Sequence, residues 1–151
     1  MPSIIPSYLY TFFALILVGT ILIGTFSSFA VSLKQIPEEK TLKNIVDYVA
    51  AESMELINYI TTVSGKATVK AVLSIPSTIN HKQYWLRLNT NSKNAFVEAG
   101  FGAIPTQAHY KVYLLANVSA SGEIIGGFGK ALLTCQRTDS GIYLSLDYLE
   151  G

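Results

Sequence analysis

The chain has 151 residues, half of them hydrophobic, with a mean hydropathy of +0.36 and a formal net charge of +1. Only 14% of its residues are charged, against about 25% in an ordinary soluble domain. No basic block is present, so a nucleic-acid partner is not expected. The single cysteine, Cys135, excludes an intrachain disulfide and a cysteine-based zinc cluster.

Residues 8–33 form a run of 26 residues without a charged side chain, and the first charged residue of the chain is Lys34. A helix needs about 20 apolar residues to cross a bilayer, so the sequence predicts a transmembrane helix within residues 1–36, with membrane lipid as its partner. The alternative is a signal peptide cut after Ala30. We prefer the uncleaved helix, because no basic residue precedes the run and a signal peptide has an apolar core of only about 7–15 residues.

Three small residues, Thr20, Gly24 and Ser28, lie four positions apart in this run and therefore on one helical face. Small residues at such spacing let membrane helices approach each other closely. Glycine and serine are also common in membrane helices that do not associate. We predict a helix-packing site at these three residues.

The charges that flank the run leave the membrane orientation open. Lys34, Lys40 and Lys43 favour a cytoplasmic position for the residues after the helix, but two glutamates share that flank. The sequence Asn117-Val118-Ser119 fits a glycosylation sequon, which requires an exterior location. Asn117 is therefore a candidate glycosylation site.

Residues 37–64 predict a second, amphipathic helix or stalk after a kink or break near Pro37. Glu38 and Glu39 would lie at its positive end, and Gly65 would stop it. Its apolar residues recur at helical spacing and are Leu42, Ile45, Val46, Val49, Leu56, Ile57, Ile60 and Val63. Two interpretations stay open: this stripe packs on the domain that follows, or it bundles with copies of itself as a short coiled coil.

In residues 65–151 the apolar period changes to two, which is typical of strands. Short aromatic and β-branched runs are separated by turn dipeptides such as Pro76-Ser77 and Ser121-Gly122. Six or seven strands at this spacing predict an all-antiparallel β-sandwich or small barrel. The fold class expected for the whole chain is α+β, with a long N-terminal helix, part transmembrane and part stalk, before the β-domain.

No group of residues in the sequence predicts catalysis, a cofactor or a metal site. His81 and His109 have no ligand spacing with each other or with Cys135, and the glycine-rich stretch 126–130 lacks the spacing of a phosphate loop, so we expect a strand turn or bulge there. We therefore expect a non-enzymatic protein without a small-molecule substrate. A set of aromatic residues should lie mostly in the core, with the remainder free to contact a partner: Tyr84, Trp85, Phe96, Phe101, Tyr110 and Tyr113.

The order of these segments resembles that of archaeal type IV pilin-like proteins, including archaellins and the membrane-anchored accessory proteins of the archaellum. The likeness rests on the uncharged helix FFALILVGTILIGTF, the stalk at 38–63 and the β-domain stretch VLSIPSTINHKQYWLRL. It implies a helix in the cell membrane, a β-domain outside the cell, and contacts with pilin-like partner proteins or with further copies of the chain.

One departure from the family bears on its role. Such pilins carry a short basic leader that is cut just before the hydrophobic helix, and MPSIIPSYLY has no such site. This departure favours a permanently anchored accessory protein over a polymerising filament subunit. A membrane-tethered binding module unrelated to pili is a further alternative.

Overall fold

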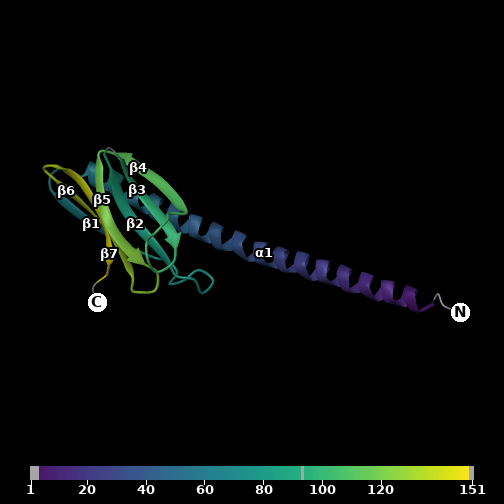
Figure 1. Ribbon diagram of the computed structural model, residues 1–151. Coiled ribbons are helices and arrows are strands. Elements are labelled where there is room, and N and C mark those ends of the chain that lie inside the picture. Colours follow the sequence, from purple (N-terminus) through teal and green to yellow (C-terminus); the bar gives the residue numbers. More distant parts are fainter. Residues whose placement is uncertain (1–3, 93, 150–151) are drawn as a thin grey trace. The chain divides into compact units, whose positions relative to one another are not determined.

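In the computed structural model, residues 4–92 and 94–149 are described, and they form one helix and seven strands (Figure 1). The side chains of residues 4–7, 34–36 and 116 lie outside the description, and with them that of Lys34. The chain divides into two compact units, Met1–Pro37 and Glu38–Gly151. The expected segments 37–64 and 65–151 therefore belong, apart from Pro37, to a single unit, which we call the β unit.

Helix α1 (Ile4–Thr62) contains Pro37, so the break expected at this residue is not found. A proline lacks the N–H that would donate to the carbonyl four residues earlier, here Leu33, while the turns on either side can keep their hydrogen bonds. The expectation that Glu38 and Glu39 begin a helix is wrong for the same reason. The helix ends at Thr62, and Gly65, with φ +94°, lies in the turn that follows it.

The strands form one open sheet in the order β1-β6-β7-β5-β2-β3-β4. This sheet does not close into a barrel, and the described residues form no second sheet; the fold is α+β, with one long helix and one mostly antiparallel sheet. The strands are β1 (Ala67–Leu73), β2 (Tyr84–Asn91), β3 (Asn94–Phe101), β4 (Tyr110–Ala116), β5 (Val118–Ile125), β6 (Ala131–Thr138) and β7 (Gly141–Tyr148).

One pair of strands is parallel, contrary to the all-antiparallel expectation. Strands β6 and β7 form a hairpin, and β7 lies between β6 and β5. As a result β7 runs in the same direction as β5, with Val118 opposite Ile142 and Gly122 opposite Leu146. Which strand of a hairpin lies inside the sheet depends on contacts far apart in the chain, so the local pattern does not reveal it.

Strand β5 contains Ser121 and Gly122, which the sequence indicates as a turn. Gly122 has φ +126°, and a Cβ atom there would lie 2.2 Å from the carbonyl oxygen of Leu146 in β7. Only glycine tolerates both this backbone conformation and this close approach. The dipeptide thus serves to let two neighbouring strands come together.

The second half of α1 covers one face of the sheet, which we call the inner face. The buried core joins the helix to alternate residues of all seven strands, including Leu86, Val97 and Leu133. Seven of the eight stripe residues are buried, at 8% exposure or less: Leu42, Ile45, Val46, Val49, Leu56, Ile57 and Ile60. Val63 is half-buried and lies just past the helix end. The stripe therefore packs on the sheet within the same chain.

Polar contacts fix both ends of this helical segment. At its start, the buried carboxylate of Glu38 accepts hydrogen bonds from Asn80 Nδ2 at 2.6 Å and from Lys82 Nζ at 2.5 Å. At its end, Arg137 Nη1 donates to the carbonyl of Val63 at 2.7 Å and, at 3.3–3.4 Å, to those of Thr61 and Ile60. A cation is favourable there, because the last carbonyls of a helix carry partial negative charge.

Replacing Val49, which is fully buried at the middle of the stripe, tests this packing. In a shortened chain of residues 37–151, Val49→Asp should lower the melting temperature by roughly 10 °C or more, because it loses about 1.5–3 kcal/mol of apolar burial and buries a carboxylate. Ala51→Asp is the matched control on the exposed side of the helix. Equal melting temperatures for the two variants would mean that the stripe does not pack on the sheet. The melting temperatures of the two variants are measured by circular dichroism on heating.

Candidate interaction surfaces

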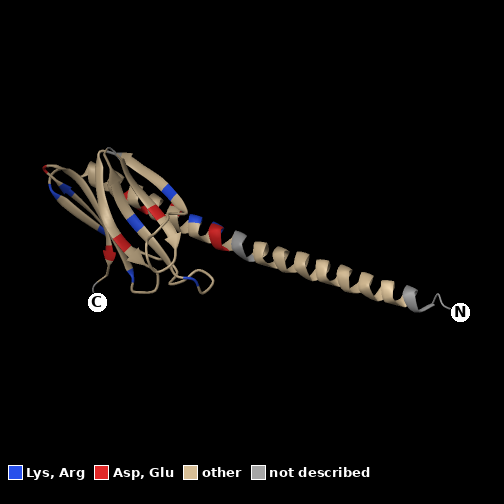
Figure 2. Cartoon of the chain, in the orientation of Figure 1, with Lys and Arg blue, Asp and Glu red and all other residues tan. Residues whose placement is uncertain are grey.

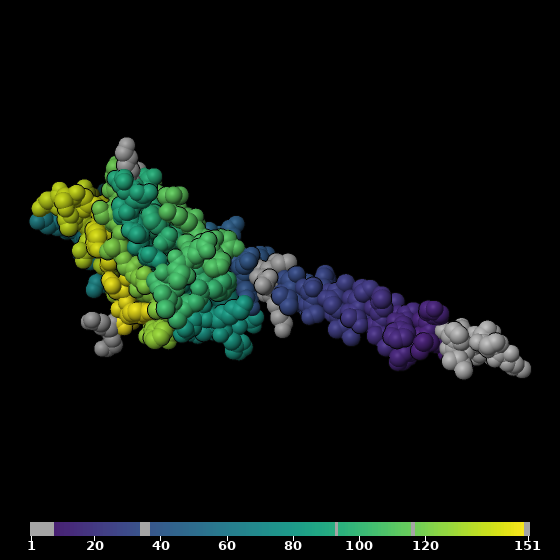
Figure 3. Space-filling view, in the orientation of Figure 1, coloured from purple at the N-terminus to yellow at the C-terminus, as the bar shows by residue number. Residues whose placement is uncertain are grey.

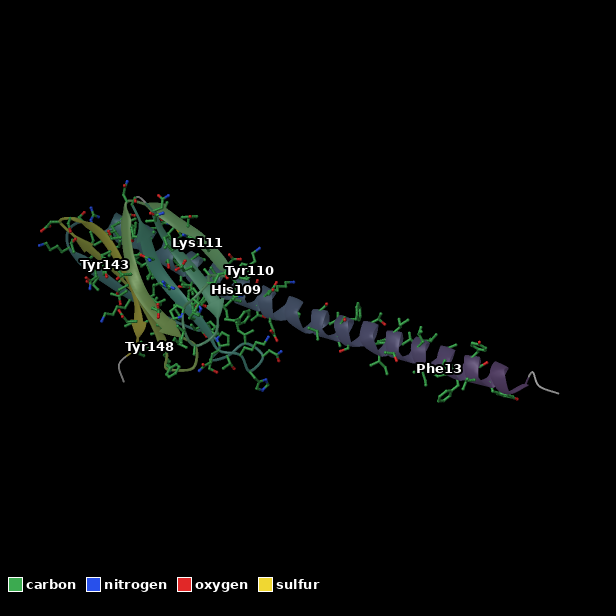
Figure 4. The ribbon with its side chains drawn as sticks, in the orientation of Figure 1. Phe13, His109, Tyr110, Lys111, Tyr143 and Tyr148 are labelled. Carbon is green, nitrogen blue, oxygen red and sulfur yellow. The ribbon has the colours of Figure 1, made fainter. Side chains whose placement is uncertain are left out.

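The first candidate surface is the part of α1 that precedes Lys34. Every residue from Tyr8 to Leu33 is exposed except the half-exposed Gly19. Figure 2 shows this stretch without an acidic or basic residue, and Phe13, labelled in Figure 4, is 60% exposed. The helix is long and apolar enough near the N-terminus to cross a membrane. Soluble monomeric proteins rarely expose a contiguous apolar surface of this length.

The predicted packing residues Thr20, Gly24 and Ser28 lie on this open surface. The hydroxyl of Thr20 donates to the carbonyl of Ile16 at 2.8 Å, and that of Ser28 donates to the carbonyl of Gly24 at 3.0 Å. Because both hydroxyls are satisfied within the helix, they do not need water or a partner. A Cβ atom added to Gly24 would meet nothing within 4 Å. This helical face therefore has small side chains whose hydroxyls are hydrogen-bonded within the helix, and such a face allows a second helix to approach closely.

The second candidate surface is the face of the sheet opposite to α1, which we call the outer face. In Figure 1 the helix passes behind the sheet, so Figure 3 shows the outer face in the same orientation. The strand register places four charged residues of alternating sign in one row across it: Lys111, Glu98, Arg87 and Glu123. Arg87 Nε lies 3.3 Å from Glu98 Oε1 and 3.4 Å from Glu123 Oε2. The positive charge of Arg87 therefore attracts one carboxylate on each of the two neighbouring strands.

Aromatic rings flank this row. The ammonium of Lys111 lies 3.5 Å from the centre of the Phe96 ring and 5.1 Å from that of Tyr113. The guanidinium of Arg87 lies 5.0 Å from the ring of Trp85. Each arrangement is a cation–π contact. Tyr113, at 58% exposure, Val72 of β1, at 53%, and Leu115, at 41%, are open apolar side chains of this face, and Tyr113 and Leu115 lie on β4 beside the charged row.

The loop 102–109 covers the part of the outer face around Trp85. The ring of Trp85 is fully buried, and its Nε1 has no hydrogen-bond partner among the described residues. A Cβ atom at Gly100 would lie 2.7 Å from both this ring and the carbonyl oxygen of Gln107. Glycine is needed there, because the loop, the ring and the strand pack against one another without room for a side chain.

The aromatic residues singled out in the sequence divide between core and surface. Tyr84 and Trp85 are fully buried on opposite faces of the sheet, and Phe96 is 5% exposed. Phe101 and Tyr110 are half-buried beside the inner core. Tyr113 alone of the six offers most of its ring to a partner.

The residues considered for chemistry lie in separate places. His81, with φ +64°, is in the tight turn that joins Ile79 to Lys82, whereas His109 packs its ring against Phe101. Cys135 is buried in the inner core, and this burial raises the pKa of its thiol. Within the described residues, no three His, Cys, Asp or Glu side chains come together as metal ligands would.

Two loop features occupy places that their sequences suggest. The stretch 126–130 connects β5 to β6 without a following helix, and its Gly127 has φ +91°. Asn117 is exposed in the turn between β4 and β5, with φ +64°, a conformation that asparagine adopts more readily than most residues. Its side chain is thus accessible to modification.

Comparison of the chain with protein-family profiles, with curated protein sequences and with solved structures finds no match.

The hydroxyl of Tyr84 donates to the carbonyl of Pro76, and burial raises the pKa of Tyr84 to about 12. The unfolded chain loses this proton near pH 10, so the free energy of unfolding should fall between pH 10 and 12 by up to about 1.4 kcal/mol per pH unit from this group. Tyr84→Phe removes the contribution. Urea unfolding of residues 37–151 gives the free energy of unfolding of the unaltered chain and of Tyr84→Phe. The value for the unaltered chain minus that for the variant should fall as the pH rises from 10 to 12. A constant difference from pH 9 to 12 would contradict it.

The packing face is tested by Gly24→Ile in the full chain. Its bulky side chain would hold two helices apart while leaving the segment apolar, so we expect crosslinked dimers in membranes to disappear and membrane recovery to stay unchanged. Gly19→Ile is the matched control, because its Cβ also meets nothing within 4 Å but lies on another face. If Gly24→Ile crosslinks as well as Gly19→Ile, the small residues do not mediate association.

Proposed function

We propose that the protein is a non-enzymatic assembly protein of a pilus- or archaellum-like surface system. Residues 8–33 anchor it in the cell membrane, the β unit lies outside the cell, and contacts with partner proteins perform its role. The observation that carries the proposal is the stretch of exposed, charge-free helix followed directly by the helical residues that build the core of the β unit.

The free-energy cost of leaving the apolar side chains of residues 8–33 in water supports the proposed anchor. Each large apolar residue gains about 1.5–3 kcal/mol on full burial, and the exposed ones include Phe12, Leu17, Ile23 and Phe26. The β unit already has its own covered core, so it does not need this segment for folding. A bilayer provides the burial that the chain itself does not.

The two open surfaces of the protein support the proposed assembly role. The small-residue face of the helix suits a second membrane helix, and the outer face of the sheet presents Tyr113 and Leu115 beside charges that are already paired. Both are open surfaces suited to protein contacts. A polymerising subunit is the second candidate, favoured by the face around Gly24; it differs in forming long filaments that electron microscopy would show.

Extraction and labelling in cells test the anchor and its orientation. The full chain should stay with membranes in alkaline carbonate, and a chain without residues 8–33 should be released. Ser140→Cys places a thiol in an exposed turn, whereas the native Cys135 is buried. A membrane-impermeant maleimide should therefore label Ser140→Cys in intact cells and leave the unaltered chain unlabelled. Labelling only after lysis would place the β unit in the cytoplasm and refute the proposal.

A further inference from the structure

Three loops gather at one end of the β unit, which we call the Glu38 end. They are the connections 74–83, 102–109 and 126–130. The second and third begin with hydrogen bonds to the same short stretch, Gly102 N to the carbonyl of Gln83 at 2.9 Å and Gly126 N to that of Tyr84 at 2.8 Å. The three loops therefore form one surface.

Glu38 is fixed at this surface by its bonds to Asn80 and Lys82 in the first loop. The apolar segment ends at Leu33, five residues earlier. Five residues reach at most about 18 Å when fully extended, and about 7.5 Å as helix. If residues 8–33 cross a membrane, this covalent reach alone keeps the Glu38 end close to the membrane surface, however the two units are oriented.

The loops of the Glu38 end carry the two most exposed large apolar side chains among the described residues of the β unit. Ile104 is 71% exposed and Phe128 is 66% exposed, and the exposed Lys130 follows two residues after Phe128. The turns at the opposite end of the sheet are polar: Asn91-Ser92, Asn117 and Asp139-Ser140. An ion pair between Lys66 and Asp139 lies at that opposite end as well. Strongly exposed apolar side chains therefore occur in the loops of the Glu38 end and are missing from the turns named at the opposite end.

We propose that the Glu38 end rests on the membrane surface, with Ile104 and Phe128 immersed in the lipid interface and Lys130 reaching the headgroup phosphates. This inference rests on the anchoring in the proposed function. Apolar side chains flanked by lysine suit the interface, where the ring or aliphatic chain is buried and the ammonium stays hydrated. The anchor holds the tips at high effective concentration near lipid, so a weak contact is sufficient. Two side chains are too few for a stable protein interface of about 1,000 Å² or more.

Fluorescence quenching of the full chain in phosphatidylcholine vesicles tests the contact. Ile104→Cys and Phe128→Cys are each labelled with an environment-sensitive dye, and the lipids carry bromine near the headgroup or deeper in the acyl chains. Ser140→Cys is the control at the opposite end, and Ile16→Cys is the control within the anchor. The unaltered chain should take up no dye, because Cys135 is buried. We expect blue-shifted emission and about twofold quenching at 104 and 128, as for groups in the interface, and neither effect at 140.

Two results would overturn the inference and one would overturn more. If positions 104 and 128 behave like 140 while position 16 is quenched, the loops face water and the anchor stands. If they are blue-shifted without lipid quenching, and the shift vanishes when the protein is diluted in lipid, a second copy of the chain covers them. If position 16 is also unquenched, the anchoring itself is wrong.

Discussion

The packing of one helical stripe on the inner face of the sheet is the contact on which the rest of the β unit depends. An open sheet with one apolar face needs a second layer, and here residues 42–60 of α1 provide it. Because the helix covers the apolar face of the sheet, neither a second sheet nor closure into a barrel is needed to bury that face. The expected sandwich or barrel is therefore not formed by the described residues. Ser53 shows how complete the cover is: its hydroxyl is buried in the stripe and donates to the carbonyl of Val49 at 2.6 Å.

Two charged side chains contact the two ends of the helical segment that covers the sheet. The carboxylate of Glu38 is buried, and it accepts hydrogen bonds from Asn80 and from the positively charged Lys82. A buried carboxylate without such partners would be strongly unfavourable, so this pairing disfavours any placement of the helix on the sheet that leaves Glu38 buried without them. Arg137 acts at the other end by satisfying carbonyls that the helix leaves open. The apolar stripe supplies the buried area, and the two charged side chains hold its two ends on the sheet.

The sequence reveals what depends on local periodicity and misses what depends on pairing. The 3.6-residue period predicts the residues of the stripe, and the period of two predicts most strands. Strand β5 is hidden because Ser121-Gly122 has turn chemistry, whereas its glycine serves the close approach to Leu146. The row of Lys111, Glu98, Arg87 and Glu123 brings together residues scattered over 37 positions, and only the strand register aligns them. Pro37 suggests a break that the flanking helical turns override.

The outer face and the apolar helical residues 8–33 differ in what they can offer a partner. On the outer face, Arg87 is shared between two carboxylates and its guanidinium faces Trp85, while Lys111 lies over two rings. A protein docking there would have to match or disrupt contacts that are already made, so its gain comes from Tyr113 and Leu115. On the helix, the hydroxyls of Thr20 and Ser28 are satisfied and the face at Gly24 is open. Approach of a second helix to this face would therefore break no hydrogen bond of either side chain. Under the proposed anchoring, we propose that association begins between these helices, before the β units take part.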